Sequence, residues 1–430
     1  MSDNPKTQVD KAWENLFDKY NSLHQIDEIG VFQISAQQIK EFKEPRLMAK
    51  FDHMINLPKI FAKNNLAILP ITRGRYAISH FDAYHKFEED NVPITKVSLP
   101  AHVHSLDYNN ITNEAMALNC AFVSGIIADF MGDHEIFATV SGRMGSGCFP
   151  FNINDTKRRH MWQINVENSQ IEIDAGFEGI QSLALFEAKR DISEDFLIRQ
   201  LYYPLRTWQS RISKPVRPIF FVYSNGIYRL YEYMFEDIYH YNSIRLVKQK
   251  SYSIEDTSIS IADIQKILET VPIVNEPMIP FPQADKFERI INLCELLCDQ
   301  RLSRTNVTQR YAFDVRQTNY YTDAARYLGL LEKISESKIP SYTVSETGKR
   351  ILNMNFKQRQ LAFCKQILAH RVFNKILRIY FERGVMPETG EIVGIMIASG
   401  LYKVKSVSTF YRRSSTVKGW VNWIVGLMND

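Results

Sequence analysis

The sequence predicts an α/β (α+β) protein that ends in a mainly α-helical domain. Strand-like runs alternate with helical segments between residues 111 and 235, as in a sheet covered by helices. The stretch TVPIVNEPMIPFPQ (270–283) holds four prolines, which disfavour helix and central strand. Beyond it the chain is mostly helical in pattern and clearly basic.

These shifts in pattern suggest the domain boundaries, and 430 residues are enough for two or three domains with separate cores. We expect an N-terminal accessory or DNA-recognition segment at 1–100 and an α/β core at 101–255. A proline-rich linker is expected at 256–283, followed by a basic helical region at 284–430.

Charge is distributed unevenly between these parts. Residues 284–430 hold 23 Lys and Arg against 13 Asp and Glu, a net charge of +10, whereas residues 1–283 hold 29 against 35, a net of −6. A basic domain of this kind is typical of proteins that bind an anionic polymer, and nucleic acid is the first candidate. A basic surface that serves only solubility is the alternative.

Cysteine usage and hydropathy indicate the compartment. The five cysteines are scattered and odd in number, which favours a reducing environment over a disulfide framework. The first residues, MSDNPKTQVDKAWENLF, lack the apolar centre of a signal peptide, and no run of 18 apolar residues is present. We therefore expect a cytoplasmic protein that does not cross a membrane.

Within the α/β region each element has its own signal. Residues 111–133 carry apolar residues at helical spacing, and 193–212 predicts an amphipathic helix with Ser193 as its N-cap. Asn225-Gly226 predicts a hairpin turn. Apolar runs predict strands at EIFATV (135–140), FPFNI (149–153), QIEIDA (170–175), ALFEAK (184–189), RPIFFVYS (217–224) and IYRLYEYMF (227–235).

The basic region has the pattern of a winged-helix unit. NVTQRYAFD and QTNYYTDAARYLGLL are spaced as a helix–turn–helix, and KISESKIPSYTVSETG predicts a two-stranded wing closed by a helix near Glu346. The remaining helical segments end in VSTFYRRSSTVKGWVNWIVGL. We expect either one winged-helix unit or two in tandem.

The stretch EIDAGFEGIQSLALFEAKRD (172–191) contains the residues that most clearly indicate a functional site. Glu187 and Lys189 end an apolar strand and share one of its faces, and Asp174 stands thirteen positions before Glu187. Burying a carboxylate and an ammonium is costly unless they pair or hold an ion. A plain salt bridge at a strand end is the simplest explanation of an isolated Glu-x-Lys.

The order of elements around this Asp-x12-Glu-x-Lys motif resembles the PD-(D/E)XK nuclease superfamily, although Ile173 stands where the family's proline would be. The resemblance implies that Asp174, Glu187 and Ala188 bind Mg²⁺, which prefers oxygen ligands. It also implies that Lys189 orients the attacking water or stabilises charge developing on the phosphate. Glu114 and Gln200 are the further catalytic candidates.

A second resemblance extends over more of the chain. KEPRLMAKFDHMINLPKIF (43–61), ILPITRGRYAI (68–78) and SGRMGSGCFPFNI (141–153) resemble segments of certain bacterial type II restriction endonucleases, and the basic end resembles their winged-helix part. The implied function is Mg²⁺-dependent, sequence-specific cleavage of double-stranded DNA in a restriction–modification system. The implied partners are duplex DNA, a second copy of the chain on that DNA, and a cognate DNA methyltransferase.

Basic and amide side chains outside the motif are candidates for DNA contact. Arg, Asn and Gln can bond base edges, whereas Arg, Lys and loop backbone hold phosphates. A packed or solvated side chain is the alternative at each position. The candidates are Arg73, Arg75, Arg143 and Ser146 (the last two in a flexible loop expected at 141–147), Arg316, Gln317, Asn319, Arg412, Arg413 and Lys418.

Two other functions fit the same pattern. One is a winged-helix regulator whose nuclease-like domain is inactive, but such a binder would not need the intact Asp174, Glu187 and Lys189. The other is a structure-specific or single-strand repair nuclease, which winged-helix units disfavour without excluding it.

Overall fold

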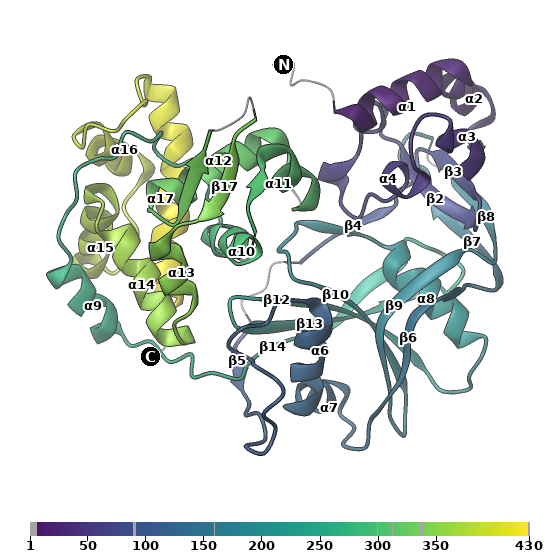
Figure 1. Cartoon of the computed structure of the whole chain (residues 1–430), viewed down its shortest axis with the longest axis horizontal. Helices are drawn as coiled ribbons and strands as arrows, with labels where there is room; N and C mark the ends of the chain where they lie inside the picture. Colours follow the sequence, from purple (N-terminus) through teal and green to yellow (C-terminus); the bar gives the residue numbers. More distant parts are fainter. Residues whose placement is uncertain are drawn as a thin grey trace.

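The computed structural model describes residues 7–88, 92–158, 160–298, 300–311, 313–335 and 339–428. The chain is a mixed α/β protein, as the sequence predicts. Figure 1 shows the N-terminal helices and the sheets on one side and a helical C-terminal half on the other. In the described part of the chain no helix combines the length and apolar character needed to cross a membrane.

The N-terminal part packs helices against a sheet that it shares with later residues. Its core forms around Trp13, Leu16 and Phe61, and a capping box between Thr7 and Asp10 starts the first helix. The sheet has the order β1-β3-β2-β8-β7. The elements are α1 (Gln8–Lys19), α2 (Ser22–Ile29), β1 (Phe32–Ser35), α3 (Ala36–Lys40), α4 (Pro45–Met48), a 3₁₀ helix (Met54–Asn56), α5 (Lys59–Asn64), β2 (Ala67–Thr72), β3 (Arg75–Ser79), β7 (Cys148–Asn154) and β8 (Met161–Glu167).

The central sheet carries the Asp-x12-Glu-x-Lys motif in its interior. Its strand order is β5-β14-β13-β12-β10-β9-β6, and β10 runs antiparallel to β9 and parallel to β12. Asn225 and Gly226 have positive φ and form the expected hairpin turn. The strands are β5 (Ile94–Lys96), β6 (Phe137–Gly145), β9 (Gln170–Glu178), β10 (Leu183–Lys189), β12 (Val216–Ser224), β13 (Ile227–Phe235) and β14 (Ile244–Ser253).

Helices cover both faces of this sheet. α6 (Glu114–Val123) and α7 (Ile126–Met131) pack on the face that receives Ala184 and Phe186 (Figure 1). α8 (Arg199–Gln209) packs on the other face, with Leu183 and Leu185. Because side chains alternate along a strand, the two last odd-numbered residues of β10, Glu187 and Lys189, lie on the α8 face.

Three expectations for this region were wrong. The helix expected at 111–133 is interrupted at Gly125, whose φ of 81° ends α6 before α7 begins. The helix expected from Ser193 begins only at Arg199, because β11 (Asp195–Leu197) pairs with β4 (Tyr84–Lys86). The loop expected at 141–147 is largely the end of β6.

The C-terminal half contains the expected helices and hairpin. β16 and β17 pair antiparallel where the wing was predicted, and the next helix starts at Glu346. In residues 353–428 no named strand occurs, so a tandem unit has no second wing there. The elements are α10 (Phe287–Leu297), β15 (Leu302–Ser303), α11 (Arg304–Arg310), α12 (Val315–Tyr327), β16 (Leu331–Ile334), β17 (Ser341–Val344), α13 (Glu346–Leu352), α14 (Phe356–Leu368), α15 (Arg371–Arg383), α16 (Thr389–Ile397) and α17 (Val407–Gly426).

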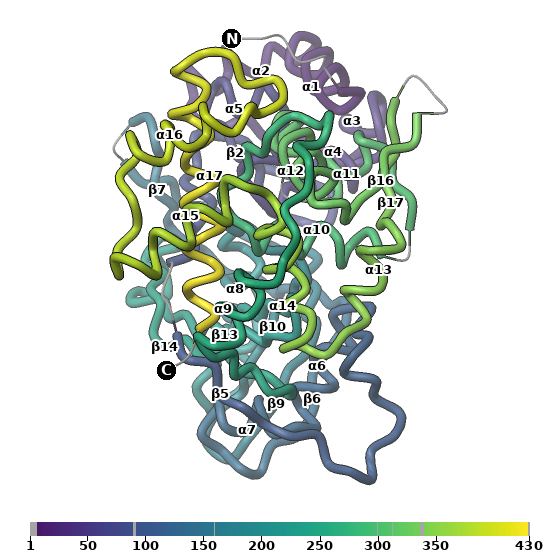
Figure 2. Tube along the Cα trace, turned by 90° about the vertical axis from the view of Figure 1, so that its left-hand side faces the viewer, coloured from purple at the N-terminus to yellow at the C-terminus, as the bar shows by residue number. Residues whose placement is uncertain are grey.

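The stretch expected as a linker belongs to the C-terminal core. Part of it is a helix, α9 (Ile261–Thr270), which begins at a capping box on Ser260. The extended residues after α9 run along the outside of the C-terminal helices (Figure 2). Phe281 is 1% exposed and stacks on Phe373. The prolines keep the segment extended, as predicted, but it is packed rather than free.

Candidate functional site

Glu187 and Lys189 form a buried ion pair at the end of β10. The Lys189 Nζ lies 2.5 Å from Glu187 Oε1, and only 16% and 11% of the Lys189 and Glu187 side chains are exposed. Gln200, in the first turn of α8, donates from Nε2 to the same Glu187 oxygen at 2.6 Å. The structure therefore brings together three of the residues singled out from the sequence.

A β-bulge brings Asp174 to the same place. Two residues of β9, Asp174 and Ala175, stand opposite the single Ser141 of β6, between the pairs Gly142–Ile173 and Val140–Gly176. A bulge of this kind redirects a side chain. The Asp174 Oδ2 accepts a hydrogen bond from the backbone N–H of Ala188 at 2.7 Å. Asp174 thus lies against the segment between Glu187 and Lys189.

Burial and neighbouring charges shift the proton affinities of the pair. Burial, with smaller contributions from Asp174 and Asp52, raises the pKa of Glu187 to about 7, although Lys189 acts in the opposite direction. Burial alone would lower the pKa of Lys189, but Glu187 and Asp52 outweigh it and raise that pKa. One lysine does not fully compensate the acidic groups, so the site favours additional positive charge.

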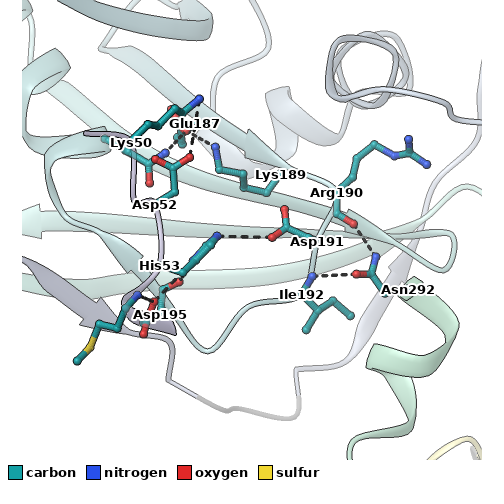
Figure 3. A network of polar contacts seen from close by, with 12 residues as sticks. Lys50, Asp52, His53, Glu187, Lys189, Arg190, Asp191, Ile192, Asp195 and Asn292 are labelled. Atoms are coloured by element: carbon teal, nitrogen blue, oxygen red, sulfur yellow. Dashed lines mark hydrogen bonds and ion pairs between the residues drawn. The ribbon is translucent and has the colours of Figure 1, made fainter. Parts of the chain in front are cut away.

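The N-terminal part contributes an acidic residue that the sequence did not single out. Figure 3 shows Asp52 beside Glu187 and Lys189, with Lys50 at 3.9 Å from the Asp52 carboxylate. The Asp52 carbonyl accepts from Leu197 N–H at 3.0 Å, which anchors this segment to β11. No local pattern relates residue 52 to residue 187, so only the fold reveals this neighbour.

His53 joins the same segment to the loop that follows Lys189. Its ring lies 3.5 Å from Asp191 Oδ2 and 3.6 Å from Asp195 Oδ1, and Nδ1 is 2.6 Å from the Asp195 carbonyl (Figure 3). Burial alone would lower the pKa of His53, but the two aspartates raise it to about 10. His53 is therefore an imidazolium at neutral pH, held between two acidic groups.

The charge on His53 should make stability depend on pH. Its pKa is raised on folding from 6.5 to about 10, so its contribution is complete below pH 6.5 and is lost as pH rises through 10. We expect His53→Gln to lower the melting temperature most at pH 6, since breaking a buried ion pair costs about 3–5 kcal/mol. Thermal unfolding between pH 6 and 10.5 measures this.

The control for that prediction is His24→Gln, because His24 forms an exposed pair with Glu28. This variant should unfold close to wild type at every pH. A His53→Gln deficit that is equal at pH 6 and pH 10.5 would show that the charge of His53 does not contribute.

Residues of α10, in the C-terminal half, contact the other side of the loop that follows Lys189. Asn292 on α10 donates from Nδ2 to the Arg190 carbonyl at 2.6 Å and accepts from Ile192 N–H at 3.2 Å (Figure 3). Arg289 Nη1 lies 3.1 Å from Glu194 Oε1. The loop after Lys189 is therefore fixed by the N-terminal segment on one side and by α10 on the other.

The donor set at the site fits the expected Mg²⁺. In the described ranges no three His, Cys, Asp or Glu side chains are grouped closely enough to hold a metal. Mg²⁺, however, is commonly bound through one or two carboxylates while keeping several waters. Asp174 and Glu187 would supply these carboxylates and Ala188 a backbone oxygen, and the buried Gln200 Oε1 has no hydrogen-bond partner. The donors are oxygen atoms, as Mg²⁺ prefers, but the space beside Glu187 and Gln200 has no room for a water molecule, so these side chains would have to move apart to admit a hydrated ion.

Glu114 lies on the other side of the sheet. It begins α6, which packs against the face opposite to α8 and Gln200. Arg190 donates to the Thr112 carbonyl just before this helix, so the start of α6 is near the end of β10. A catalytic role for Glu114 stays a prediction.

The candidates for DNA contact in the first half differ in exposure. Arg73 and Arg75 are exposed where β2 turns into β3. Arg143 is on β6, not in a loop, and pairs with Glu172 at 3.1 Å. Ser146 is 2% exposed, and its carbonyl accepts from Thr207. The expectation of a flexible loop at 141–147 was therefore wrong, because most of these residues belong to β6 and Ser146 is buried, whereas phosphate contact by Arg143 and Ser146 stays a prediction.

The C-terminal candidates also separate into two groups. Arg316 and Arg412 are exposed. The other side chains are half-buried: Gln317 Oε1 accepts from Asp314 N–H in a capping box, Lys418 donates to Thr389 at 2.7 Å, and Asn319 and Arg413 line a cavity. Exposure favours Arg316 and Arg412 for phosphate contact.

Three family models match the chain, and each is described only as a domain of unknown function. They are DUF6996 at residues 10–78, DUF6997 at 79–253 and DUF7226 at 289–429. No curated protein and no solved structure matches. Asp52 and His53 lie in the first matched region, Glu187 and Lys189 in the second, and Asn292 in the third. The site is thus assembled from all three.

Proposed function

We propose that the chain is a Mg²⁺-dependent DNA endonuclease of the PD-(D/E)XK type that acts as a type II restriction enzyme. One observation carries the proposal: the bulge in β9 holds Asp174 against Ala188, beside the buried Glu187–Lys189 pair. Two carboxylates and a lysine on adjoining strands are groups that can serve metal-assisted phosphodiester hydrolysis.

The surrounding architecture supports this proposal. A mixed sheet with helices on both faces surrounds the motif, as in the nuclease family that the sequence resembles. The order α10-β15-α11-α12-β16-β17 is that of a winged-helix unit, in which α12 would be the recognition helix. The net charge of +10 in residues 284–430 suits a DNA-binding part.

Each residue has a defined task in the proposed reaction. Asp174, Glu187 and the Ala188 carbonyl would hold Mg²⁺, which when bound offsets phosphate charge and lowers the pKa of a water. Gln200 fixes one oxygen of Glu187. Lys189 places a positive charge where the pentavalent phosphorus becomes more negative, and its burial strengthens that interaction.

The alternative, a DNA-binding regulator without nuclease activity, explains the buried Glu187–Lys189 pair less well. The Glu187–Lys189 pair is almost fully buried, and buried ion pairs often stabilise a fold less than apolar residues would. A protein that only bound DNA would gain little from this cluster.

The decisive experiment incubates the full-length protein with unmethylated phage DNA and Mg²⁺. Discrete fragments support a restriction enzyme, a smear supports a nonspecific or repair nuclease, and intact DNA supports a regulator. Protection of the same DNA by a cognate methyltransferase would complete the restriction–modification assignment. Cutting both strands needs either two active sites, from a second copy of the chain on the DNA, or two sequential nicks by one site.

A substitution of Arg412 tests DNA binding by the basic region 284–430 separately from DNA cleavage. Arg412 is exposed near the start of α17, so Arg412→Ala should weaken binding to all sequences about equally. Removing one phosphate contact should lower the slope of log affinity against log salt by about 0.9. Arg412→Lys, which keeps the charge, should keep the slope. Equal slopes for wild type and Arg412→Ala would remove this residue from the interface.

A further inference from the structure

A cavity in the C-terminal half lies away from the acidic site. It has a volume of about 300 Å³ and lies between the extended segment 280–283, α12 and α17. Its polar lining comes from Gln283, Asn319, Tyr320, Asp323, Lys403 and Arg413. A volume of about 300 Å³ is at the lower end for small-molecule sites, so the cavity suits a compact ligand.

Unpartnered polar atoms at this cavity indicate what the ligand must provide. Arg413 Nε and Nη1 and Gln283 Oε1 are buried without a hydrogen-bond partner. Such atoms are rare in folded proteins and call for a partner. Asp323 is bonded at 2.7 Å to Arg326, which already offsets its charge. The cavity is therefore positive, with Lys403 and Arg413 as its cations.

We propose that this cavity binds a single nucleotide. The phosphate would lie at Arg413 and Lys403, which suit an anion with several acceptor oxygens. The base would lie against the ring of the half-buried Tyr320 and the flat faces of Pro280 and Pro282. Gln283 Oε1 would accept from an amino group on the base edge, and Asn319 can donate to a ring nitrogen or a carbonyl.

The nucleotide can come from two sources with the same chemistry. A free mononucleotide could enter the cavity, or duplex DNA could extrude one nucleotide into it. The second source rests on the proposed function. In that case α12 and α17 would contact an unstacked base, and so recognise its modification state, in addition to contacting the duplex.

The test measures binding of dAMP, dCMP, dGMP and dTMP to the full-length protein by calorimetry, without divalent metal. At least one nucleotide should bind saturably, and Arg413→Ala should weaken it by about tenfold or more, as expected for a lost charged hydrogen bond. The matched control is Lys405→Ala, because Lys405 is an exposed cation in the same loop as Lys403 that does not line the cavity. Its affinity should stay within about twofold of wild type.

Lys403 provides a second variant that does not disturb the helix packing. Its φ of 57° is in the left-handed region, which Asn tolerates better than most residues. Lys403→Asn therefore removes the charge and keeps the backbone, and it should also weaken nucleotide binding. Wild-type affinity in both Lys403→Asn and a folded Arg413→Ala would overturn the proposal.

Duplexes with 2-aminopurine separate the two sources. A rise in fluorescence that wild type causes and Arg413→Ala does not supports an extruded nucleotide. Binding of free nucleotides without that rise supports a free nucleotide as the ligand. Absence of both signals overturns the inference. Because no metal is present, DNA cleavage can fail while the nucleotide result stands, and the reverse also holds.

Discussion

Asp174→Asn and Glu187→Gln are each expected to lower DNA cleavage by several orders of magnitude while duplex binding stays near that of wild type. In the proposed reaction, either change replaces a carboxylate that would bind the cation with a neutral amide, so cation binding and activation of the attacking water would both weaken. Single-turnover cleavage measures the rate, and a mobility-shift assay in Ca²⁺ measures binding. Mn²⁺ titration by calorimetry gives a readout that does not depend on turnover.

The matched control is Glu172→Gln. Glu172 lies on the same strand as Asp174, but it is exposed and pairs with Arg143. Its loss should change the cleavage rate by less than about threefold, as for other surface ion pairs. Full activity in Asp174→Asn or Glu187→Gln would remove the metal assignment.

Lys189→Ala should retain cation binding and lose most of the cleavage rate. Its ammonium is buried beside Glu187, and in the proposed reaction it would stabilise charge that develops only in the transition state, so the loss should appear in kcat more than in KM. Steady-state and single-turnover kinetics at saturating Mg²⁺ separate the two effects.

Lys214→Ala serves as the comparison for that variant. Lys214 also bonds a glutamate, Glu178 at 2.7 Å, but its side chain is 37% exposed. This change should leave cleavage close to wild type. If Lys189→Ala also cut DNA within a few-fold of wild type, the lysine would be only the partner of a salt bridge.

Local pattern was sufficient to predict much of the central sheet from the sequence. Alternating apolar residues place β9, β10, β12 and β13 within a few positions of the observed bounds, and the two positive φ angles explain the Asn225-Gly226 turn. The same alternation puts Glu187 and Lys189 on one face. These features depend on neighbours in sequence, which is why pattern predicts them.

Features that depend on distant pairing were not predictable. β11 forms at Asp195–Leu197 because β4 offers it a partner, although the local pattern favours helix. Asp174 reaches β10 through a bulge whose opposing strand starts more than thirty residues earlier. Asp52 and His53 meet the site only because three parts of the chain pack together.

The hydrogen bonds of Asn292 to the loop after Lys189 affect when this loop is fully supported during synthesis. Asn292 is 102 residues further along the chain than Arg190, whose carbonyl it contacts. At about 5–20 residues per second, ribosomes need at least several seconds to make that distance. Until then the loop has the contacts of His53 and Thr112 but lacks those of Asn292. If the chain is the nuclease proposed above, an unfinished nascent chain would carry the motif without this support, and cleavage would begin only after α10 has been made.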